Sequence, residues 1–148
     1  MIDPLRELSR AARVVSIARD HKGREIGWYR AGVDVAVDVT RDGQALRYVE
    51  RGQMRAVNGK RSAATNRLRW SLEGDELVLE HERMGEPVVI ARFAIDELAD
   101  SAETLEPHPC DKDLYIGRMT LTVCTVELDW TVRTPRGDER VRTRYRLS

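Results

Sequence analysis

Apolar residues alternate with polar residues along most of this chain, which is the pattern of half-buried β-strands. The first clear case is residues 33–39, where every second residue is valine. Asp42 and Gly43 follow and favour a tight hairpin turn. The return strand is expected at residues 45–52. Because the side chains of a strand alternate between its faces, one face carries Leu46, Tyr48 and Glu50.

The same pattern returns after a polar stretch. Residues 53–64 are expected to form a polar loop, and strands resume at Asn66 with turns at residues 74–75 and 84–86. The inward faces are predicted to carry Leu68, Trp70 and Leu72, then Leu77, Leu79, His81 and Arg83, and then Val89, Ala91, Phe93 and Ile95. Three further strands are expected at residues 114–123, 126–133 and 139–147.

Helical signals are confined to two short stretches. Asp3 followed by Pro4 is typical of a helix start. The apolar run at residues 14–18 either ends this helix or forms the first strand. Residues 95–102 are expected to make one or two helical turns. The apolar positions at helical spacing near the N-terminus are Leu5, Leu8, Ala12 and Val15.

The predicted fold class is all-β with a short N-terminal helix. The count is about eight strands in consecutive hairpins, without the spacing of βαβ units and without an internal repeat. Closing such an antiparallel meander into a barrel removes its exposed edges. An eight-stranded barrel encloses either a side-chain core or one small ligand. An open sandwich is the alternative architecture.

Length and charge limit the classes of function. The 148 residues fit one domain, expected to span residues 1–148. The 25 basic and 25 acidic residues cancel and are spread along the chain. No overall field therefore favours nucleic acid or an anionic membrane as a partner.

The lack of a recognisable signal peptide or membrane span, together with the low cysteine content, predicts a cytoplasmic protein. Residues 1–12 do not resemble a signal peptide, because charged residues stand where an apolar run is required. No stretch approaches the roughly 20 apolar residues of a membrane span. Cys110 and Cys124 are the only cysteines, as expected of a reduced protein without a structural disulfide.

The segment from His108 to Tyr115 is the most irregular part of the pattern. Asp113 and Tyr115 share an inward face with the apolar residues that follow them. His108 and Cys110 have the opposite parity, so an uninterrupted strand would place them outside. A bulge or turn at residues 111–112 would bring all four side chains to one side.

Several sequence motifs resemble those of a known family. They are His108-Pro109-Cys110-x-x-Asp113-x-Tyr115, Trp130-x-Val132, Thr134-Pro135-Arg136-Gly137-Asp138, a last strand with Tyr145 and Arg146, and the earlier Tyr48-x-Glu50-x-Gly52. Over roughly residues 27–147 the chain resembles the small lipocalin-like proteins of domain-of-unknown-function family 6314. The resemblance implies a lipocalin or calycin type of barrel and carries no known activity.

Polar and aromatic residues on the inward faces of different strands converge in a barrel, which predicts a pocket. The leading hypothesis is that this pocket binds a small, partly polar or amphipathic ligand, with no cofactor. One alternative is an acid/base enzyme of the isomerase or hydratase type, with Asp113 as base and Tyr115 or His108 as acid. Another is a purely structural network of hydrogen bonds. The candidate pocket residues are His108, Cys110, Asp113, Tyr115, Tyr48, Glu50, Trp70, His81, Arg83, Trp130 and Tyr145.

Other site chemistries have less support. His108, Cys110 and Asp113 are suitable zinc donors, but no second pair of ligands follows, so no metal site is predicted. A catalytic Cys110 with His108 has no third residue to complete it. Haem ligation by His81 or His108 has no specific signal.

The last predicted strand carries arginine at positions 140, 142, 144 and 146, all on the outer face. The neighbouring strand presents Glu127 and Asp129 there, so cross-strand ion pairs are expected. An anion-binding or nucleic-acid-binding surface is the alternative, and acidic neighbours weigh against it. This face or an edge strand could also support a homodimer, although no pattern requires one.

Overall fold

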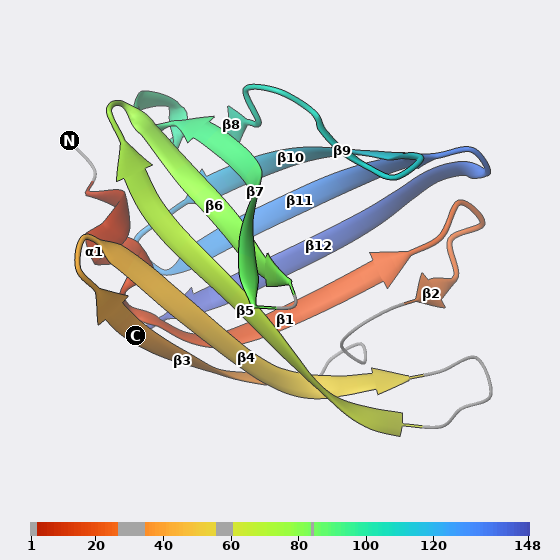
Figure 1. Ribbon diagram of the computed structural model, residues 1–148, viewed down its shortest axis with the longest axis horizontal. Helices are drawn as coiled ribbons and strands as arrows, with labels where there is room; N and C mark the ends of the chain where they lie inside the picture. The colour runs from red at the N-terminus through yellow and green to blue at the C-terminus, as the bar shows by residue number, and fades with distance from the viewer. Residues whose placement is uncertain (1–2, 27–34, 56–60, 84) are drawn as a thin grey trace.

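Antiparallel β-strands make up most of the protein in this computed structural model, which describes residues 3–26, 35–55, 61–83 and 85–148 (Figure 1). The long strands are β1 (Ala11–Arg19), β3 (Val35–Asp42), β4 (Ala45–Arg55), β5 (Arg61–Glu73), β6 (Glu76–Arg83), β7 (Glu86–Ala94), β10 (Asp113–Leu121), β11 (Thr125–Thr134) and β12 (Gly137–Leu147). The short ones are β2 (Glu25–Ile26), β8 (Ala102–Glu103) and β9 (His108–Cys110). Helical structure is limited to α1 (Pro4–Leu8) and the 3₁₀ turn η1 (Ile95–Glu97). The all-β class with a short N-terminal helix is therefore confirmed.

The strands form one sheet that curls into a nearly closed barrel (Figure 1). Its hydrogen-bonded order is β7-β6-β5-β4-β3-β1-β12-β11-β10-β8, with β2 on β1 and β9 on β10. The backbone N–H of Leu105, just after β8, donates to the carbonyl of Arg92 in β7 at 2.9 Å and draws the two edges together. The barrel prediction is thus confirmed over the sandwich. The predicted count of about eight strands is wrong, because the described residues alone form a sheet of 12 strands, three of them only two or three residues long.

The N-terminal helix caps one end of the barrel, on the left in Figure 1. Asp3 caps it by accepting a hydrogen bond from the backbone N–H of Arg6 at 3.2 Å. Leu5 and Leu8 are buried on its inner side. The apolar run at residues 14–18 belongs to β1 and not to the helix. One end of the barrel interior is therefore closed by side chains.

The predicted polar loop at residues 53–64 is wrong at both of its ends. β4 continues to Arg55 and β5 already begins at Arg61, with Arg55 and Arg61 paired across the hairpin. Backbone pairing with a neighbour maintains these strand ends whatever their side chains, whereas alternation reveals only the part that packs on a core. Residues 33–34, 56–60 and Met84, where parts of a strand, a loop and a turn are expected, lie outside the described residues.

A bulge in the β6–β7 pair changes the predicted inward face of β7. Leu79 pairs with Ala91, but Glu80 pairs with Val89, so Ile90 is the extra residue. Val89 was expected to face inward with Ala91 and is instead 37% exposed. Ile90 turns towards the interior in its place. Leu72, also expected inside, is 42% exposed near the end of β5.

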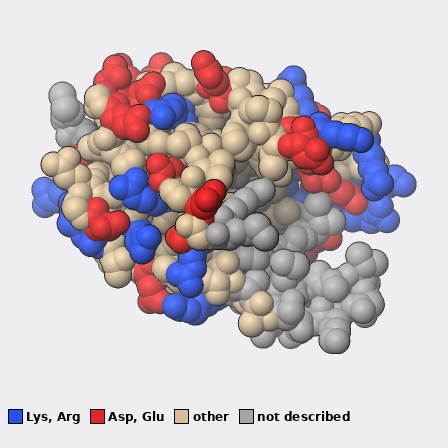
Figure 2. All heavy atoms as spheres, in the orientation of Figure 1, with Lys and Arg blue, Asp and Glu red and all other residues tan. Residues whose placement is uncertain are grey.

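Charged side chains of both signs are interspersed on the face of the molecule in Figure 2.

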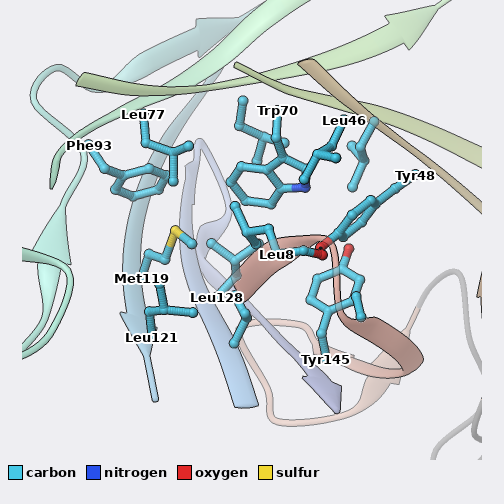
Figure 3. Close-up of a cluster of buried hydrophobic side chains, with 14 of the residues drawn as sticks. Leu8, Leu46, Tyr48, Trp70, Leu77, Phe93, Met119, Leu121, Leu128 and Tyr145 are labelled. Carbon is cyan, nitrogen blue, oxygen red and sulfur yellow. Dashed lines mark hydrogen bonds between the residues drawn. The ribbon is translucent and has the colours of Figure 1, made fainter. Parts of the chain in front are cut away.

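An apolar core fills the α1 end of the barrel (Figure 3). The ring of Tyr48 makes edge contacts with Trp70 at 6.0 Å and Tyr145 at 5.3 Å between centroids. Its hydroxyl donates to the carbonyl oxygen of Leu8. This hydrogen bond connects the aromatic core to α1. Side chains fill the barrel interior at this end. Other core side chains are Leu46, Leu77, Phe93, Met119, Leu121 and Leu128.

Candidate functional site

The barrel holds a cavity of about 400 Å³ beyond this core. The face in Figure 2 is hollowed right of centre, away from the end that α1 occupies. Most of the wall is apolar, and a few polar side chains interrupt it. The lining residues are Ser16, Glu50, Asn66, Leu68, Leu79, His81, Ile90, His108, Cys110, Tyr115, Leu128, Trp130, Val141, Thr143 and Tyr145.

A buried carboxylate lies at the deep level of the cavity. Glu50 is only 1% exposed. The hydroxyl of Tyr145 donates to its Oε2, and Nδ2 of Asn66 donates to its Oε1 at 3.2 Å. These donors compensate part of the cost of removing a carboxylate from water. Burial, and then the charge of Glu50, raises the pKa of Tyr48 well above its ordinary value.

A second buried polar pair lines the cavity from two neighbouring strands. The hydroxyls of Ser16 in β1 and Thr143 in β12 are 2.9 Å apart and share a hydrogen bond. Both side chains are buried and line the cavity. The predicted pocket residues did not include Ser16 and Thr143. Thr143 nevertheless lies two residues from Tyr145, and Ser16 two residues from Val14, so each faces the same side of its strand as that inward residue. Asn66, which has the parity of Leu68, was omitted in the same way.

The β9–β10 hairpin contributes partly exposed side chains to the cavity wall. Cys110 pairs with Asp113, and His108 pairs with Tyr115, so the chain reverses at residues 111–112. Asp111 adopts a positive φ of 57° there, a conformation that Asp tolerates better than most residues. The reversal returns His108 and Cys110 to the side of Tyr115, where all three line the cavity.

Three aromatic rings, from His108, Tyr115 and Trp130, follow one another along this wall. The centroids of His108 and Tyr115 are 6.3 Å apart, and those of Tyr115 and Trp130 are 6.5 Å apart with an interplanar angle of 75°. Trp130 lies opposite Gly117 in the β10–β11 ladder. A Cβ atom at Gly117 would come within 2.8 Å of the Trp130 ring, so glycine allows this ring position. The aromatic row is a surface against which a flat apolar group can pack.

A family model described as a family of unknown function, DUF6314, matches residues 13–147. The chain belongs to this family. The match begins at residue 13 and therefore includes most of β1. The resemblance noted from the sequence motifs covered only residues 27–147 and did not include this strand. Searches of curated proteins and of solved structures found no match. The DUF6314 match identifies the family and brings no activity with it.

The structure brings together seven of the predicted pocket residues of this DUF6314 protein. Tyr48 and Trp70 lie instead in the packed core, one layer closer to α1. Parity correctly places both inside the barrel but does not show how far along the barrel axis each lies. Asp113 is half-buried and outside the described lining, and the side chain of Arg83 is not described. The seven are Glu50, His81, His108, Cys110, Tyr115, Trp130 and Tyr145.

The arginines of β12 lie on the outer face, as expected. Arg142 contacts Asp129 at 2.9 Å, and Arg144 contacts Glu127 at 2.7 Å. Arg140 lies directly opposite Arg19 of β1. The predicted cross-strand ion pairs with β11 are therefore confirmed for the two central arginines.

Two other kinds of feature are absent from the part of the chain that the structure describes. In the described ranges, no three His, Cys, Asp or Glu side chains are grouped so that they could hold a metal ion. No helix in those ranges is long and apolar enough to cross a membrane. Cys110 and Cys124 flank opposite ends of β10 and are not joined by a disulfide.

Proposed function

We propose that this DUF6314 protein is a lipocalin-like, or calycin-like, barrel that binds a small, partly polar molecule in its interior. The cavity beside Glu50 supports this most directly. Its volume of about 400 Å³ falls within the roughly 300–1,000 Å³ of small-molecule sites. Apolar walls with a few converging polar groups are also typical of such sites, since the walls provide affinity and the polar groups provide orientation.

The acid/base enzyme is less well supported than binding. That alternative assigns the base to Asp113, which lies outside the described lining. A general base has to reach the proton that it removes, directly or through one water. The geometry therefore favours retention of a ligand over a reaction at Asp113.

A purely structural role for the polar groups explains less of the geometry than ligand binding does. The hydrogen bonds from Tyr145 and Asn66 to Glu50 do hold three strands together. A network that only stabilised the barrel would not need open volume beside it, because protein interiors are normally close-packed. We also place the protein in a reducing compartment such as the cytoplasm, which the two cysteines without a disulfide support.

Retention of a small molecule tests the proposal. The protein is purified from cells under native conditions, weighed by native mass spectrometry, then denatured and extracted for small molecules. Val141→Trp fills the cavity from β12, whereas Arg140→Trp adds the same side chain on the outer face. The expected result is a bound molecule in the wild type and in Arg140→Trp but not in Val141→Trp. Equal retention in both variants would contradict an interior site.

A further inference from the structure

We infer that a bound molecule enters and leaves the interior through a seam in the barrel wall, between β7 and residues 105–109. The inference rests on the proposed function, because it concerns access to the same interior site. It is carried by a second cavity of about 440 Å³ that lies along this seam. Two side chains line both this second cavity and the interior one.

The seam is the place where the hydrogen-bonded order of the sheet ends. β7 is the first strand of this order and β8 is the last, whereas hydrogen bonds join every pair of neighbours between them. Among the described residues, one backbone hydrogen bond joins β7 to the segment after β8, from the N–H of Leu105 to the carbonyl of Arg92. Neighbours such as β11 and β12 instead pair along the whole of β11. Opening the seam therefore breaks few bonds, and such local openings cost much less than unfolding.

Two prolines keep this segment from pairing further with β7. Pro107 and Pro109 have no backbone N–H, so neither can donate to a neighbouring strand. Between them, His108 pairs with Tyr115 of β10, on the side away from β7. Prolines commonly protect an edge strand against pairing with another chain. Here they also leave the two edges of the barrel wall unjoined beyond Leu105.

The two cavities adjoin at Ile90 and His108. The second cavity lies between residues 89–92 of β7 and residues 105–109, and it also touches Glu76. Ile90 and His108 are partly buried and line both cavities. Ile90 is the extra residue of the β7 bulge, and such a residue is left without a ladder partner. The gate between the two cavities therefore consists of these two side chains.

Stopped-flow kinetics with 2-naphthalenemethanol test the passage. This probe is a flat apolar molecule with one hydroxyl, and tryptophan fluorescence reports its binding because Trp130 lines the interior cavity. Val89→Phe narrows the second cavity from β7. It should slow association and dissociation about tenfold each and leave Kd unchanged, because an obstacle in a passage affects both directions equally. Val123→Phe adds the same ring in the turn after β10, where residue 123 is 77% exposed, and should keep the wild-type rates.

A second variant tests the role of the prolines. The double substitution Pro107→Ala and Pro109→Ala restores two backbone N–H groups that can pair with β7, and it should also slow both rates without changing Kd. Pro135→Ala removes a proline from the β11–β12 turn, which borders neither cavity, and should leave the rates unchanged. The double variant tests the passage independently where Val89→Phe does not fold.

Two results would overturn the passage and leave interior binding standing. One is the wild-type rates in both Val89→Phe and the double proline variant. The other is faster dissociation of the probe with unchanged association, which would make the second cavity part of the binding site itself. No binding of the probe to the wild type, together with no retained molecule, would overturn both the passage and the proposed function.

Discussion

The hydroxyl of Tyr145 donates a hydrogen bond to the carboxylate of Glu50, which lies 95 residues earlier in the chain. Their strands, β12 and β4, are not neighbours, because β1 and β3 lie between them in the sheet. The bond therefore crosses the interior of the barrel at the deep level of the cavity. It contributes both to the closure of the fold and to the shape of the candidate site.

Loss of this bond should cost stability. Tyr145→Phe removes the hydroxyl donor and leaves the buried Glu50 with less compensation, so we expect the free energy of unfolding to fall by about 1–3 kcal/mol. Urea unfolding measures the change. In a double-mutant cycle with Glu50→Gln, the two substitutions should be clearly non-additive. Strict additivity would show that the pair does not interact in solution.

Alkaline pH should destabilise the fold through Tyr48. Burial and the charge of Glu50 raise its pKa in the folded state, whereas the unfolded chain releases the proton near the ordinary value of about 10. This difference in pKa contributes to the free energy of unfolding. The contribution is fully present below pH 10 and is lost as the pH rises above 10, by at most about 1.4 kcal/mol per pH unit.

The phenylalanine variant at position 48 tests this linkage. Tyr48→Phe cannot ionise, so its free energy of unfolding should fall less steeply above pH 10 than that of the wild type. It should also be less stable at neutral pH, because the bond to the Leu8 carbonyl is lost. Unfolding in urea at several pH values between neutrality and pH 11 gives both quantities. Identical slopes would rule out Tyr48 as the source.

Parity of side chains was the most reliable guide from the sequence. It placed Glu50, His81 and Tyr145 on inward faces, and all three line the cavity. It works because neighbouring residues of a strand must point to opposite sides, whatever the rest of the fold does. The same rule, applied to every polar residue of these strands, would also have found Asn66 and Thr143.

Depth and local irregularity could not be predicted in this way. Tyr48 and Trp70 face inward but pack beneath the cavity, because α1 and its Leu8 fill that end of the barrel. The bulge at Ile90 reverses the expected faces of half a strand and has no composition signal. Depth depends on how remote elements align along the barrel, and the bulge depends on how β7 pairs with β6; the alternation within a single strand carries no information about either.

The outer arginines should contribute little to stability. The side chains of Arg142 and Asp129 are 76% and 44% exposed, so solvent screens their interaction. We expect a double-mutant cycle with Arg142→Ala and Asp129→Ala to give a coupling energy of about 0.2–1 kcal/mol. It should shrink further as salt is raised, because exposed charges are screened. A larger coupling that ignores salt would contradict this reading of the ladder as a solvated surface.

The contact between Gly117 and Trp130 should control the shape of the cavity. A Cβ atom at position 117 would lie 2.8 Å from Cζ3 of Trp130 and 3.2 Å from Cγ2 of Thr104. Gly117→Ala should therefore displace the Trp130 ring from the wall, at a cost of about 1–3 kcal/mol for overpacking. We expect weaker binding of 2-naphthalenemethanol by calorimetry.

Gly74→Ala separates this effect from general loss of stability. Gly74 has a positive φ of 58° in the β5–β6 turn, and nothing lies within 4 Å of an added Cβ atom. Alanine there is strained by about 1–2 kcal/mol without touching the cavity. Gly74→Ala should thus be destabilised to a similar extent and bind the naphthalene probe as the wild type does. If Gly117→Ala also bound like the wild type, Trp130 would not form part of the ligand surface.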